Sequence, residues 1–364
     1  MIRVGVNLLW LRPGVVGGSE QFLVRLLDGV GRRAQVDVEL RLYVLPEFVE
    51  AHPQLAETFP TVVAPIEGAT PARRVLCEQR WLPGRLRGDG LDVSFHAGGT
   101  MPLRPGPRPV LLIHDVQYLD HPEWFPFVKR SYLRFQVPRS VEAAALVAAP
   151  SHHAVDRLVE AFGVDPARTA VLPHGIDPPA IEPVVPQQLD APVVLYPAIT
   201  YPHKRHDLLV RAAAQMTSPA KVVLVGGESS AEDDVRRLID DLGVGERVVR
   251  TGRVSDDELE RWWQSAAVLA WPSAYEGFGA PLVEAMTRGV PVVASNHTAV
   301  PEVVGSGGVI VDSDDPAVWA ARLDDALRPE RAEELRSAGR TRATTFGVDR
   351  AVDRLLEIFH RAAN

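Results

Sequence analysis

Residues 268–302 read VLAWPSAYEGFGAPLVEAMTRGVPVVASNHTAVPE, and this stretch indicates the fold more clearly than any other. Its two short apolar runs, Val268–Ala270 and Val290–Ala294, are typical of buried strands. Between them, Leu282–Arg288 has the pattern of a helix, and Gly289 suits the left-handed position that commonly follows one. The stretch therefore predicts a strand, a helix and a second strand, which is the repeating unit of a parallel sheet.

The loop before this helix predicts a site for a ligand that carries both phosphates and hydroxyl groups. Backbone N–H groups at a helix N-terminus favour anions. Two carboxylates, Glu276 in the loop and Glu284 in the helix, suit hydroxyl groups rather than phosphate. A nucleotide sugar offers both kinds of group. The N–H groups belong to Gly277, Phe278, Gly279 and Ala280, and Pro281 follows in the first turn, where its missing N–H is not needed.

The spacing of these residues resembles the signature of the retaining nucleotide-sugar glycosyltransferases of family 4. Members carry E-G-F-G-x-P-x-x-E-A-M, followed by G-x-P-V-x-A-S and P-E, and all of these elements occur within residues 276–302. The resemblance implies that Glu276 contacts hydroxyls of the donor sugar and that Glu284 holds the ribose. It also implies that the amides of Gly277–Gly279 lie along the sugar and the diphosphate.

Strands alternate with helices along the whole chain, which predicts an α/β fold. The alternation is interrupted at Pro178–Pro192, a proline-rich segment without a hydrophobic pattern. We expect residues 1–178 and 193–346 to form two Rossmann-like domains with parallel sheets, joined by a linker over residues 179–192. The resemblance implies the GT-B fold, with a cleft between the domains and a C-terminal helix, residues 347–364, that returns to the N-terminal domain.

The first predicted strand, Arg3–Leu9, leads into a loop with the pair Gly17-Gly18 and a helix over Gln21–Val30. Ser19 is expected to cap this helix. The pattern is not G-x-G-x-x-G, which disfavours a dinucleotide oxidoreductase. In the family, a glycine pair here lets the backbone approach the donor diphosphate and the acceptor; the alternative is a plain flexible loop.

A polar pair, His114-Asp115, follows the predicted strand Pro109–Ile113, at the end of a parallel strand where ligands bind. The resemblance assigns His114 to the transferred sugar, and the alternative is a histidine that only ties loops together. Asp115 either orients the loop or contacts substrate. Aromatic residues crowd the following segment and suit sugar rings, so Tyr118 and Trp124 are candidates for the acceptor site.

Residues 73–87 combine basic and aromatic side chains and allow two interpretations. The sequence predicts a helix over Leu76–Leu86. Such a stretch is either a solvated face or a weak peripheral contact with anionic lipid or an acceptor phosphate. The residues concerned are Arg73, Arg74, Arg80, Trp81, Arg85 and Arg87.

Lys204 is predicted to bind the diphosphate of the donor. It lies in TYPHKRHDLLV, after the first strand of the second half and before a helix. Only Lys129 and Lys221 accompany it in a chain that otherwise uses arginine. An ammonium at this place can neutralise a leaving diphosphate, and the family carries a lysine at the corresponding position, so we assign a catalytic role to Lys204 beside His114 and Glu276.

The remaining donor residues are less clearly defined. The arginine that the family often carries six residues before the lysine is replaced by Ala198, so either Arg205 or His203 substitutes for it or a donor with other demands is used. Gly226 ends a predicted strand, and Arg253 lies in a stretch that frames the base in the family. Contacts to the base there are mostly through backbone, so the sequence does not identify the nucleotide.

No metal or other cofactor is expected. The histidines lack the spacing of a zinc site, and the acidic pairs, such as Asp233-Asp234 and Asp314-Asp315, are expected in helix starts or loops rather than in a metal site. The charge of the leaving diphosphate would then be met by Lys204 and by the amides of Gly277–Ala280 and Gly17-Gly18. The resemblance implies front-face displacement, in which the leaving phosphate oxygen helps to deprotonate the acceptor hydroxyl.

The composition is that of an ordinary globular protein, with 46% hydrophobic and 24% charged residues among 364. A net charge of −8 disfavours binding to nucleic acid. The single cysteine, Cys77, fits a reducing cytoplasm. The start, MIRVGVNLLWLRPG, is expected to be neither a signal peptide nor a membrane helix. We expect a cytoplasmic protein, with peripheral contact at the inner face of the membrane as the alternative; the oligomeric state is left open.

The expected activity is transfer of a hexosyl group from a nucleotide-diphosphate sugar to a hydroxyl of a glycan, lipid-linked or small-molecule acceptor. HDVQYLDHPEWF, residues 114–125, resembles mannosyltransferase-like members and slightly favours GDP-mannose over a UDP- or dTDP-sugar. The alternatives are a GT-B sugar phosphorylase, a nucleotide-sugar epimerase, or a catalytically silent subunit that binds a nucleotide sugar. Intact Glu276, Glu284, Lys204 and His114 disfavour a silent subunit.

Overall fold

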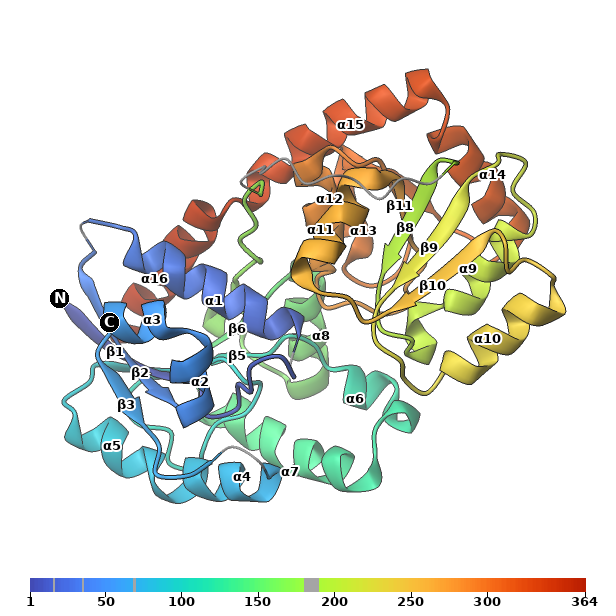
Figure 1. Cartoon of the computed structure of the whole chain (residues 1–364). Coiled ribbons are helices and arrows are strands. Elements are labelled where there is room, and N and C mark those ends of the chain that lie inside the picture. Colours follow the sequence, from blue (N-terminus) through green and yellow to red (C-terminus); the bar gives the residue numbers. More distant parts are fainter. Residues whose placement is uncertain (16, 35, 68–69, 180–189) are drawn as a thin grey trace. The chain divides into compact units, whose positions relative to one another are not determined.

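A computed structural model describes residues 1–15, 17–34, 36–67, 70–179 and 190–364, and its chain divides into two compact units (Figure 1). The N-terminal unit comprises Met1–Gly175 and Val348–Asn364, and the C-terminal unit comprises Ile176–Gly347. The N-terminal unit is thus built from two separate pieces of the chain. Residues 180–189 of the predicted linker lie outside the described residues.

The N-terminal unit contains a seven-stranded parallel sheet in the order β3-β2-β1-β4-β5-β6-β7. The order reverses between β1 and β4, and ligands of such sheets bind at this switch point, outside the carboxyl ends of the strands. The strands are β1 (Ile2–Asn7), β2 (Val38–Val44), β3 (Thr61–Val63), β4 (Val93–His96), β5 (Pro109–Leu112), β6 (Leu146–Ala149) and β7 (Thr169–Val171).

Helices cover both faces of this sheet because its strands are apolar on both sides. They are α1 (Gly18–Gly31), α2 (Pro46–Ala51), α3 (Pro53–Thr58), α4 (Pro71–Arg80), α5 (Leu82–Gly88), α6 (Gln117–Asp120), η1 (Pro122–Trp124), α7 (Phe127–Ala143), α8 (His152–Phe162), η2 (Pro166–Arg168) and α16 (Val348–Ala363). On β5, Val110 packs in a core with α1 and α16, whereas Leu111 packs in a core with α7 and α8. Helices α1 and α16 lie side by side, since a Cβ at Gly29 would be only 2.5 Å from Val348 (Figure 1).

The C-terminal unit contains a six-stranded parallel sheet in the order β10-β9-β8-β11-β12-β13, which reverses between β8 and β11. Helices α9, α10 and α14 lie on one side of this sheet and α11 and α12 on the other (Figure 1). The strands are β8 (Val193–Pro197), β9 (Lys221–Val225), β10 (Val248–Gly252), β11 (Ala266–Trp271), β12 (Val292–Ser295) and β13 (Val309–Val311). The helices are η3 (Pro202–Lys204), α9 (His206–Ala213), α10 (Glu232–Asp241), α11 (Asp256–Ser265), α12 (Ala280–Arg288), α13 (Val300–Val304), η4 (Gly305–Gly307), α14 (Pro316–Ala326), α15 (Pro329–Ala343) and η5 (Thr344–Phe346).

The predicted α/β class with two parallel sheets is confirmed, but two predictions about helices are wrong. The single helix predicted over Leu76–Leu86 is two helices, because Pro83 lacks an N–H and suits only the first turn of α5. Ser19 does not cap α1, since Gly17 occupies the cap position with φ 65° and ψ −128°. Only glycine adopts that conformation readily, so the chain turns into the helix two residues earlier than predicted.

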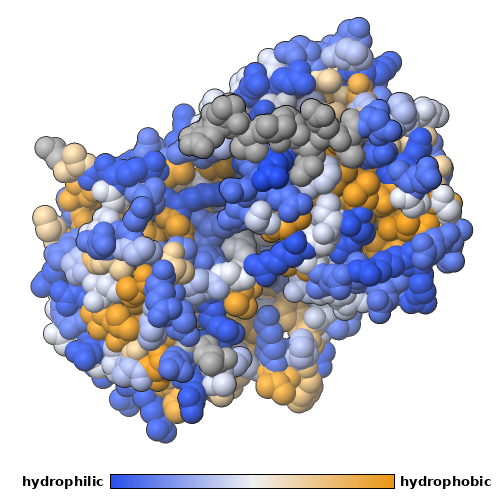
Figure 2. Space-filling model, viewed as in Figure 1, coloured by the Kyte–Doolittle hydropathy of each residue, from blue (hydrophilic) through white to orange (hydrophobic). Residues whose placement is uncertain are grey.

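The surface seen in Figure 2 is mostly hydrophilic, with apolar side chains in scattered patches. Such scattered patches are normal for a globular protein. Within the described ranges, none of the helices has the length and apolar character needed to span a membrane.

A buried carboxyl group lies beside the ends of β1 and β4. Glu78 of α4 is 6% exposed, and its Oε1 accepts a hydrogen bond from Nδ2 of Asn7 at 2.6 Å. The same Nδ2 lies 3.2 Å from Nδ1 of His96, and Nε2 of His96 lies 3.0 Å from the carbonyl oxygen of Pro105. Nε2 therefore carries the proton and Nδ1 accepts. Burial raises the pKa of Glu78 to about 7 and lowers the pKa of His96 to about 4.

We predict that Glu78→Gln stabilises the protein at pH 8 but has much less effect at pH 4.5. The folded state holds a proton on Glu78 that the unfolded chain releases between about pH 4.5 and 7, so the parent loses stability as the pH rises through that window. The full difference is about 3 kcal/mol. Glutamine keeps an acceptor for Asn7 without the charge. Urea unfolding at both pH values measures this, with exposed Glu57→Gln as control; an equal effect at both pH values would contradict it.

Candidate active site

Lys204 and Glu276 meet at the switch point of the C-terminal sheet. Lys204 ends η3, which follows β8, and Glu276 lies in the loop after β11; β8 and β11 are the neighbours between which the strand order reverses. Nζ of Lys204 donates a hydrogen bond to Oε1 of Glu276 at 2.6 Å. The side chains are 17% and 11% exposed, so water screens neither charge well and each depends on the other.

The backbone of Lys204 is fixed by the strands beneath it. The hydroxyl of Tyr196, on β8, donates to the carbonyl oxygen of Lys204 at 2.5 Å. The Lys204 ammonium lies 5.3 Å from the ring centroid of Trp271, on β11, where the ring face attracts a cation. The N–H of Ala274 donates to the carbonyl oxygen of His203 at 2.8 Å and so joins the loops that carry the two charged residues.

The backbone of Glu276 is held by the segment after β12. Its N–H donates to Oγ1 of Thr298 at 2.9 Å, and its carbonyl oxygen accepts from the N–H of Ala299 at 3.4 Å. The hydroxyl of Ser295, on β12, donates to the carbonyl oxygen of Ser273 at 2.6 Å. Three neighbouring strands, β8, β11 and β12, therefore supply the loops that place the ion pair.

The glycine-rich loop leads directly into α12. Gly279 is the left-handed residue before the helix, with φ 87°, and Gly289 is the left-handed residue after it, with φ 70°. Pro281 lies in the first turn and the helix ends at Arg288, as predicted, but it begins at Ala280, two residues before the predicted start at Leu282. Phe278 is 3% exposed and meets the ring of Phe346 edge-on at 5.5 Å. Because its ring is buried, the loop can offer a ligand the backbone of this residue but little of its side chain.

The other predicted donor residues of this unit differ in what they contact. Glu284 is half-buried at the fifth position of α12, and Arg253 is exposed after β10. A Cβ on Gly226 would lie 2.2 Å from the carbonyl oxygen of Ala198, so this glycine lets two loops approach closely. Nε of Arg205 lies 3.3 Å from Asp207 and its Nη1 lies 3.0 Å from Asp314. The guanidinium of Arg205 is thus already paired with two carboxylates, and its substitution for the arginine that is missing at Ala198 stays a prediction.

His114 lies in the N-terminal unit, just after the end of β5, which is the strand end predicted for it. Its Nε2 lies 3.3 Å from the carbonyl oxygen of Ala97, after β4, and its ring is edge-on to Phe22 of α1 at 5.9 Å. Burial lowers the pKa of His114 to about 4, so the imidazole is neutral at pH 7. Its one N–H, on Nε2, donates to the Ala97 carbonyl oxygen, and Nδ1 is an acceptor.

His174 was not among the predicted site residues, yet it lies beside His114. Its ring stacks on Phe22 at 4.3 Å and is edge-on to His114 at 6.2 Å. Burial lowers the pKa of His174 below its usual range. The available signal was its position, three residues after β7 at the same edge of the sheet as His114.

The glycine pair of the N-terminal unit is open to a ligand. A Cβ on Gly17 or Gly18 would meet no other atom within 4 Å, so packing does not require glycine at either place. The positive φ of Gly17, the residue that precedes α1, does require glycine there. The pair can therefore present backbone at the end of β1.

The three predicted acceptor residues have different surroundings in the structure. Oδ1 of Asp115 accepts from the N–H of Gln117 at 2.9 Å, which orients the loop. Tyr118 is 4% exposed within the core of α7, α8 and β6, so it is a core residue and offers no surface for a sugar ring. Trp124 is half-buried and stacks on His121 at 3.7 Å, so its ring is only partly exposed.

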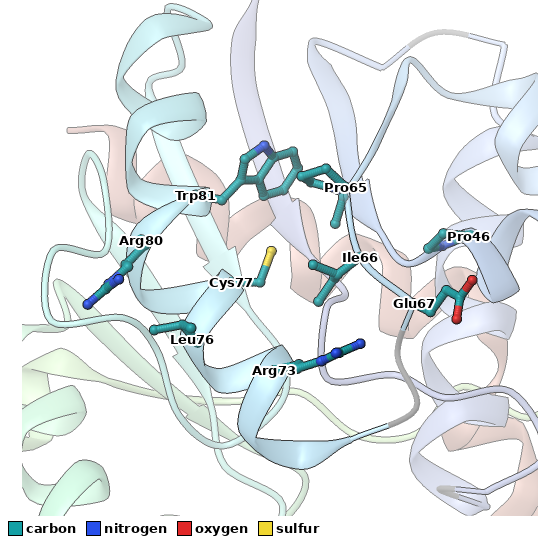
Figure 3. A pocket seen from close by; sticks show the side chains of 10 residues that line it. Pro46, Pro65, Ile66, Glu67, Arg73, Leu76, Cys77, Arg80 and Trp81 are labelled. Carbon is teal, nitrogen blue, oxygen red and sulfur yellow. The ribbon is translucent and has the colours of Figure 1, made fainter.

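The first part of the basic-aromatic stretch, residues 73–81, borders a pocket that the sequence did not predict (Figure 3). Its volume is about 760 Å³. It lies between α4 and the segments that follow β2 and β3, with Cys77 and Trp81 opposite Pro65 and Ile66. Arg74 does not line it, since its Nη1 donates to the carbonyl oxygen of Trp10 at 3.0 Å. The basic residues of this stretch therefore do not form one continuous face. The pocket residues are Pro46, Ala64, Pro65, Ile66, Glu67, Arg73, Leu76, Cys77, Arg80 and Trp81.

Both halves of the chain match known families. The model described as "Glycosyltransferase Family 4" matches residues 16–179, and the model described as "Glycosyl transferases group 1" matches residues 179–342. D-inositol 3-phosphate glycosyltransferase of Xylanimonas cellulosilytica is 32% identical over 238 residues, which is 60% of this chain and 57% of that protein. O-antigen chain mannosyltransferase B of Escherichia coli is 28% identical over 266 residues, 69% of this chain and 70% of that protein. The chain thus aligns with less than two thirds of the inositol-phosphate relative.

The fold matches that of solved structures over nearly the whole chain. The Anabaena protein Alr3699/HepE, crystallised with UDP and glucose, has a TM-score of 0.74 at 19% identity, covering 98% of this chain and 99% of that one. The two parallel-sheet units and this likeness define the GT-B fold of glycosyltransferases. The chain belongs to the glycosyltransferases of family 4, as the motif in residues 276–302 predicts.

We predict that Lys204→Ala weakens binding of a nucleoside diphosphate by roughly ten-fold or more, because a charge-assisted contact contributes about 1.5–3 kcal/mol. Lys204→Arg should recover only part, since a planar guanidinium does not fit a compact ammonium site. Calorimetry with a nucleoside diphosphate and a nucleoside monophosphate measures this. The matched control is Lys221→Ala, which removes a lysine from the opposite end of the sheet, where it pairs with Asp190.

The double variant Lys204→Ala, Glu276→Gln separates two causes of weaker binding. If the loss in Lys204→Ala came only from a carboxylate left without its cation, neutralising Glu276 would restore the affinity. We expect no restoration. Unchanged affinity in Lys204→Ala would show that the diphosphate does not contact this residue.

Proposed function

We propose that the protein transfers a hexosyl group from a nucleotide-diphosphate sugar to an acceptor hydroxyl, with retention of anomeric configuration and without a bound metal. The observation that carries this proposal is the Lys204–Glu276 ion pair beside the glycine-rich loop and the N-terminus of α12. A cation, an anion and a helix N-terminus within one site match the phosphates and hydroxyls of a nucleotide sugar.

The roles of the two charged groups follow from their chemistry. The Lys204 ammonium can share its protons between Glu276 and a phosphate oxygen, and so stabilise the diphosphate as it leaves. The Glu276 carboxylate accepts hydrogen bonds from sugar hydroxyls and is attracted more strongly as the sugar gains positive charge. Retention would follow from front-face attack, with the leaving phosphate oxygen taking the proton of the acceptor hydroxyl.

For the donor we propose GDP-mannose first, with UDP- and dTDP-sugars as alternatives. The name of the Escherichia coli relative supports a mannosyl donor, whereas the Anabaena structure contains UDP. For the acceptor we propose a hydroxyl of a glycan, a lipid-linked sugar or a polyol such as an inositol phosphate, which the name of the Xylanimonas relative supports. His114, neutral and at a strand end, is proposed to contact the transferred sugar through Nδ1, which accepts a hydrogen bond from a sugar hydroxyl.

The test is to mix each donor with candidate acceptors and to determine the anomeric configuration of the product by NMR. An α-linked donor should give an α-glycoside. A β-glycoside would contradict retention but not transfer. An epimerase would instead change the donor with no acceptor present, and a phosphorylase would require inorganic phosphate.

We predict that activity survives dialysis against excess EDTA. The charge of the leaving diphosphate is met by Lys204 and by backbone amides in this proposal, so a divalent ion is not needed. Initial rates before and after dialysis measure this. Activity that is lost and then restored by Mg²⁺ or Mn²⁺ would show that an ion takes part in the charge balance.

We predict that Glu276→Gln lowers turnover by roughly ten-fold or more while changing donor affinity much less. An amide oxygen still accepts from a hydroxyl, but it does not attract the positive charge that develops on the sugar. Turnover numbers and calorimetric dissociation constants are compared, with exposed Glu246→Gln as control. Parental turnover on a verified donor would remove Glu276 from the mechanism.

A further inference from the structure

Left-handed backbone at residues other than glycine is concentrated at the ion pair. Among the described residues, Arg108, Arg205 and Thr298 have positive φ, at 32°, 52° and 50°. Arg205 directly follows Lys204, and Thr298 contacts Glu276. Such strain persists only where the surroundings enforce it, and it clusters at functional sites. For threonine, which is branched at Cβ, this conformation is a true outlier.

The turn that contains Thr298 holds both polar groups of the Glu276 backbone. Oγ1 of Thr298 accepts from the Glu276 N–H at 2.9 Å, and the N–H of Ala299 donates to the Glu276 carbonyl oxygen at 3.4 Å. The N–H of Val300 donates to the carbonyl oxygen of His297 at 3.0 Å and closes the turn. With both groups bonded to one turn, neither peptide unit beside the Glu276 Cα can rotate without breaking a hydrogen bond.

The hydroxyl of Thr298 explains why a strained residue is used here. Glycine would form the same left-handed turn without strain. What threonine adds is an acceptor for the Glu276 N–H, and that acceptor faces the residue whose carboxylate pairs with Lys204. The ordinary explanation, a turn whose residue type is unimportant, does not account for the cost of placing threonine there.

We propose that Thr298 is a positioning residue for Glu276. Its strained backbone directs Oγ1 to the Glu276 peptide and so fixes the carboxylate where it meets both Lys204 and the donor sugar. This inference rests on the proposed role of Glu276 in transfer. Thr298 itself touches neither the substrate nor the reacting atoms in this proposal.

A second contact links the two strained turns. Asp314, after β13, accepts from Nη1 of Arg205 at 3.0 Å, and its other oxygen lies 3.7 Å from Nε2 of His297, next to Thr298. The Asp314 side chain is 58% exposed, so solvent screens these contacts and they contribute little alone. The hydrogen bond from Glu276 to Thr298 is therefore the contact to test.

The test compares Thr298→Gly with Thr298→Ser. Glycine relieves the strain but removes the acceptor, so we expect thermal stability at or above that of the parent, together with turnover lowered roughly five-fold, the value of one ordinary hydrogen bond. Serine keeps Oγ, so its turnover should stay close to the parental value. The dissociation constant of the nucleoside diphosphate should be unchanged in both. A turn that is only structural predicts a glycine variant as active as the parent, and that result would overturn the proposal.

Two further variants separate this inference from the proposed function. In the double variant Thr298→Gly, Glu276→Gln, the loss should be no larger than in Glu276→Gln alone, because Thr298 acts through Glu276; additive losses would overturn the proposal. Arg108→Gly relieves comparable strain in the other unit and should leave turnover unchanged. If Glu276→Gln is itself fully active, the proposed role of Glu276 in transfer fails; if it is inactive while Thr298→Gly is fully active, only the positioning role of Thr298 fails.

Discussion

The ion pair between Lys204 and Glu276 is the interaction on which the candidate site depends. Two charges that are 17% and 11% exposed have given up most of their hydration, and only close contact, here 2.6 Å, offsets that cost. Removing one partner leaves a charge with poor solvation, so the pair enforces its own geometry. The loops around the pair must therefore place the two side chains within the distance of one hydrogen bond, which is more precise than general packing requires.

The topology of the sheet explains how the loops place Lys204 and Glu276 so precisely. The strand order reverses between β8 and β11, so the chain after each strand leaves in a different direction and both loops border the same crevice. Gly226 allows the loops after β8 and β9 to approach within van der Waals distance, and Tyr196 fixes the carbonyl of Lys204 from below. Contacts with the buried strands thus hold in place loops that would otherwise move independently.

The sequence predicted the parts of this arrangement that depend on local patterns. The helix after the glycine-rich loop, its proline in the first turn and its left-handed glycine at the end follow from residue types within a few positions, and they are confirmed. The break before Pro83 also has a local signal, the proline itself, but the helix predicted over Leu76–Leu86 ran across it. Family resemblance supplied the residues of the donor loop, and their roles stay predictions.

Contacts between distant segments could not be predicted in the same way. Lys204 and Glu276 were each assigned to a donor group, yet nothing in their sequence neighbourhood shows that they bind each other across 72 positions. Tyr118 was expected at a sugar, but it is a buried member of a core formed by β5, β6, α7 and α8. Thr298 could not be recognised at all, because its importance comes from a backbone angle and a partner 22 residues away.

The charges around the loop suggest how a site in a chain of net charge −8 could select an anionic ligand. Lys204 is matched by Glu276, and Arg205 by Asp207 and Asp314, so the cations beside the loop are balanced by carboxylates. A simple anion that drew Lys204 away would leave Glu276 with a poorly solvated charge, and the gain from one contact would be offset by the loss of the other. A ligand that brings a phosphate to Lys204 and a hydroxyl to Glu276 at the same time compensates both. On the proposed function, the ion pair therefore favours an intact nucleotide sugar over phosphate or a free sugar. Only the intact molecule offers both a phosphate to Lys204 and a hydroxyl to Glu276 when it weakens their hydrogen bond.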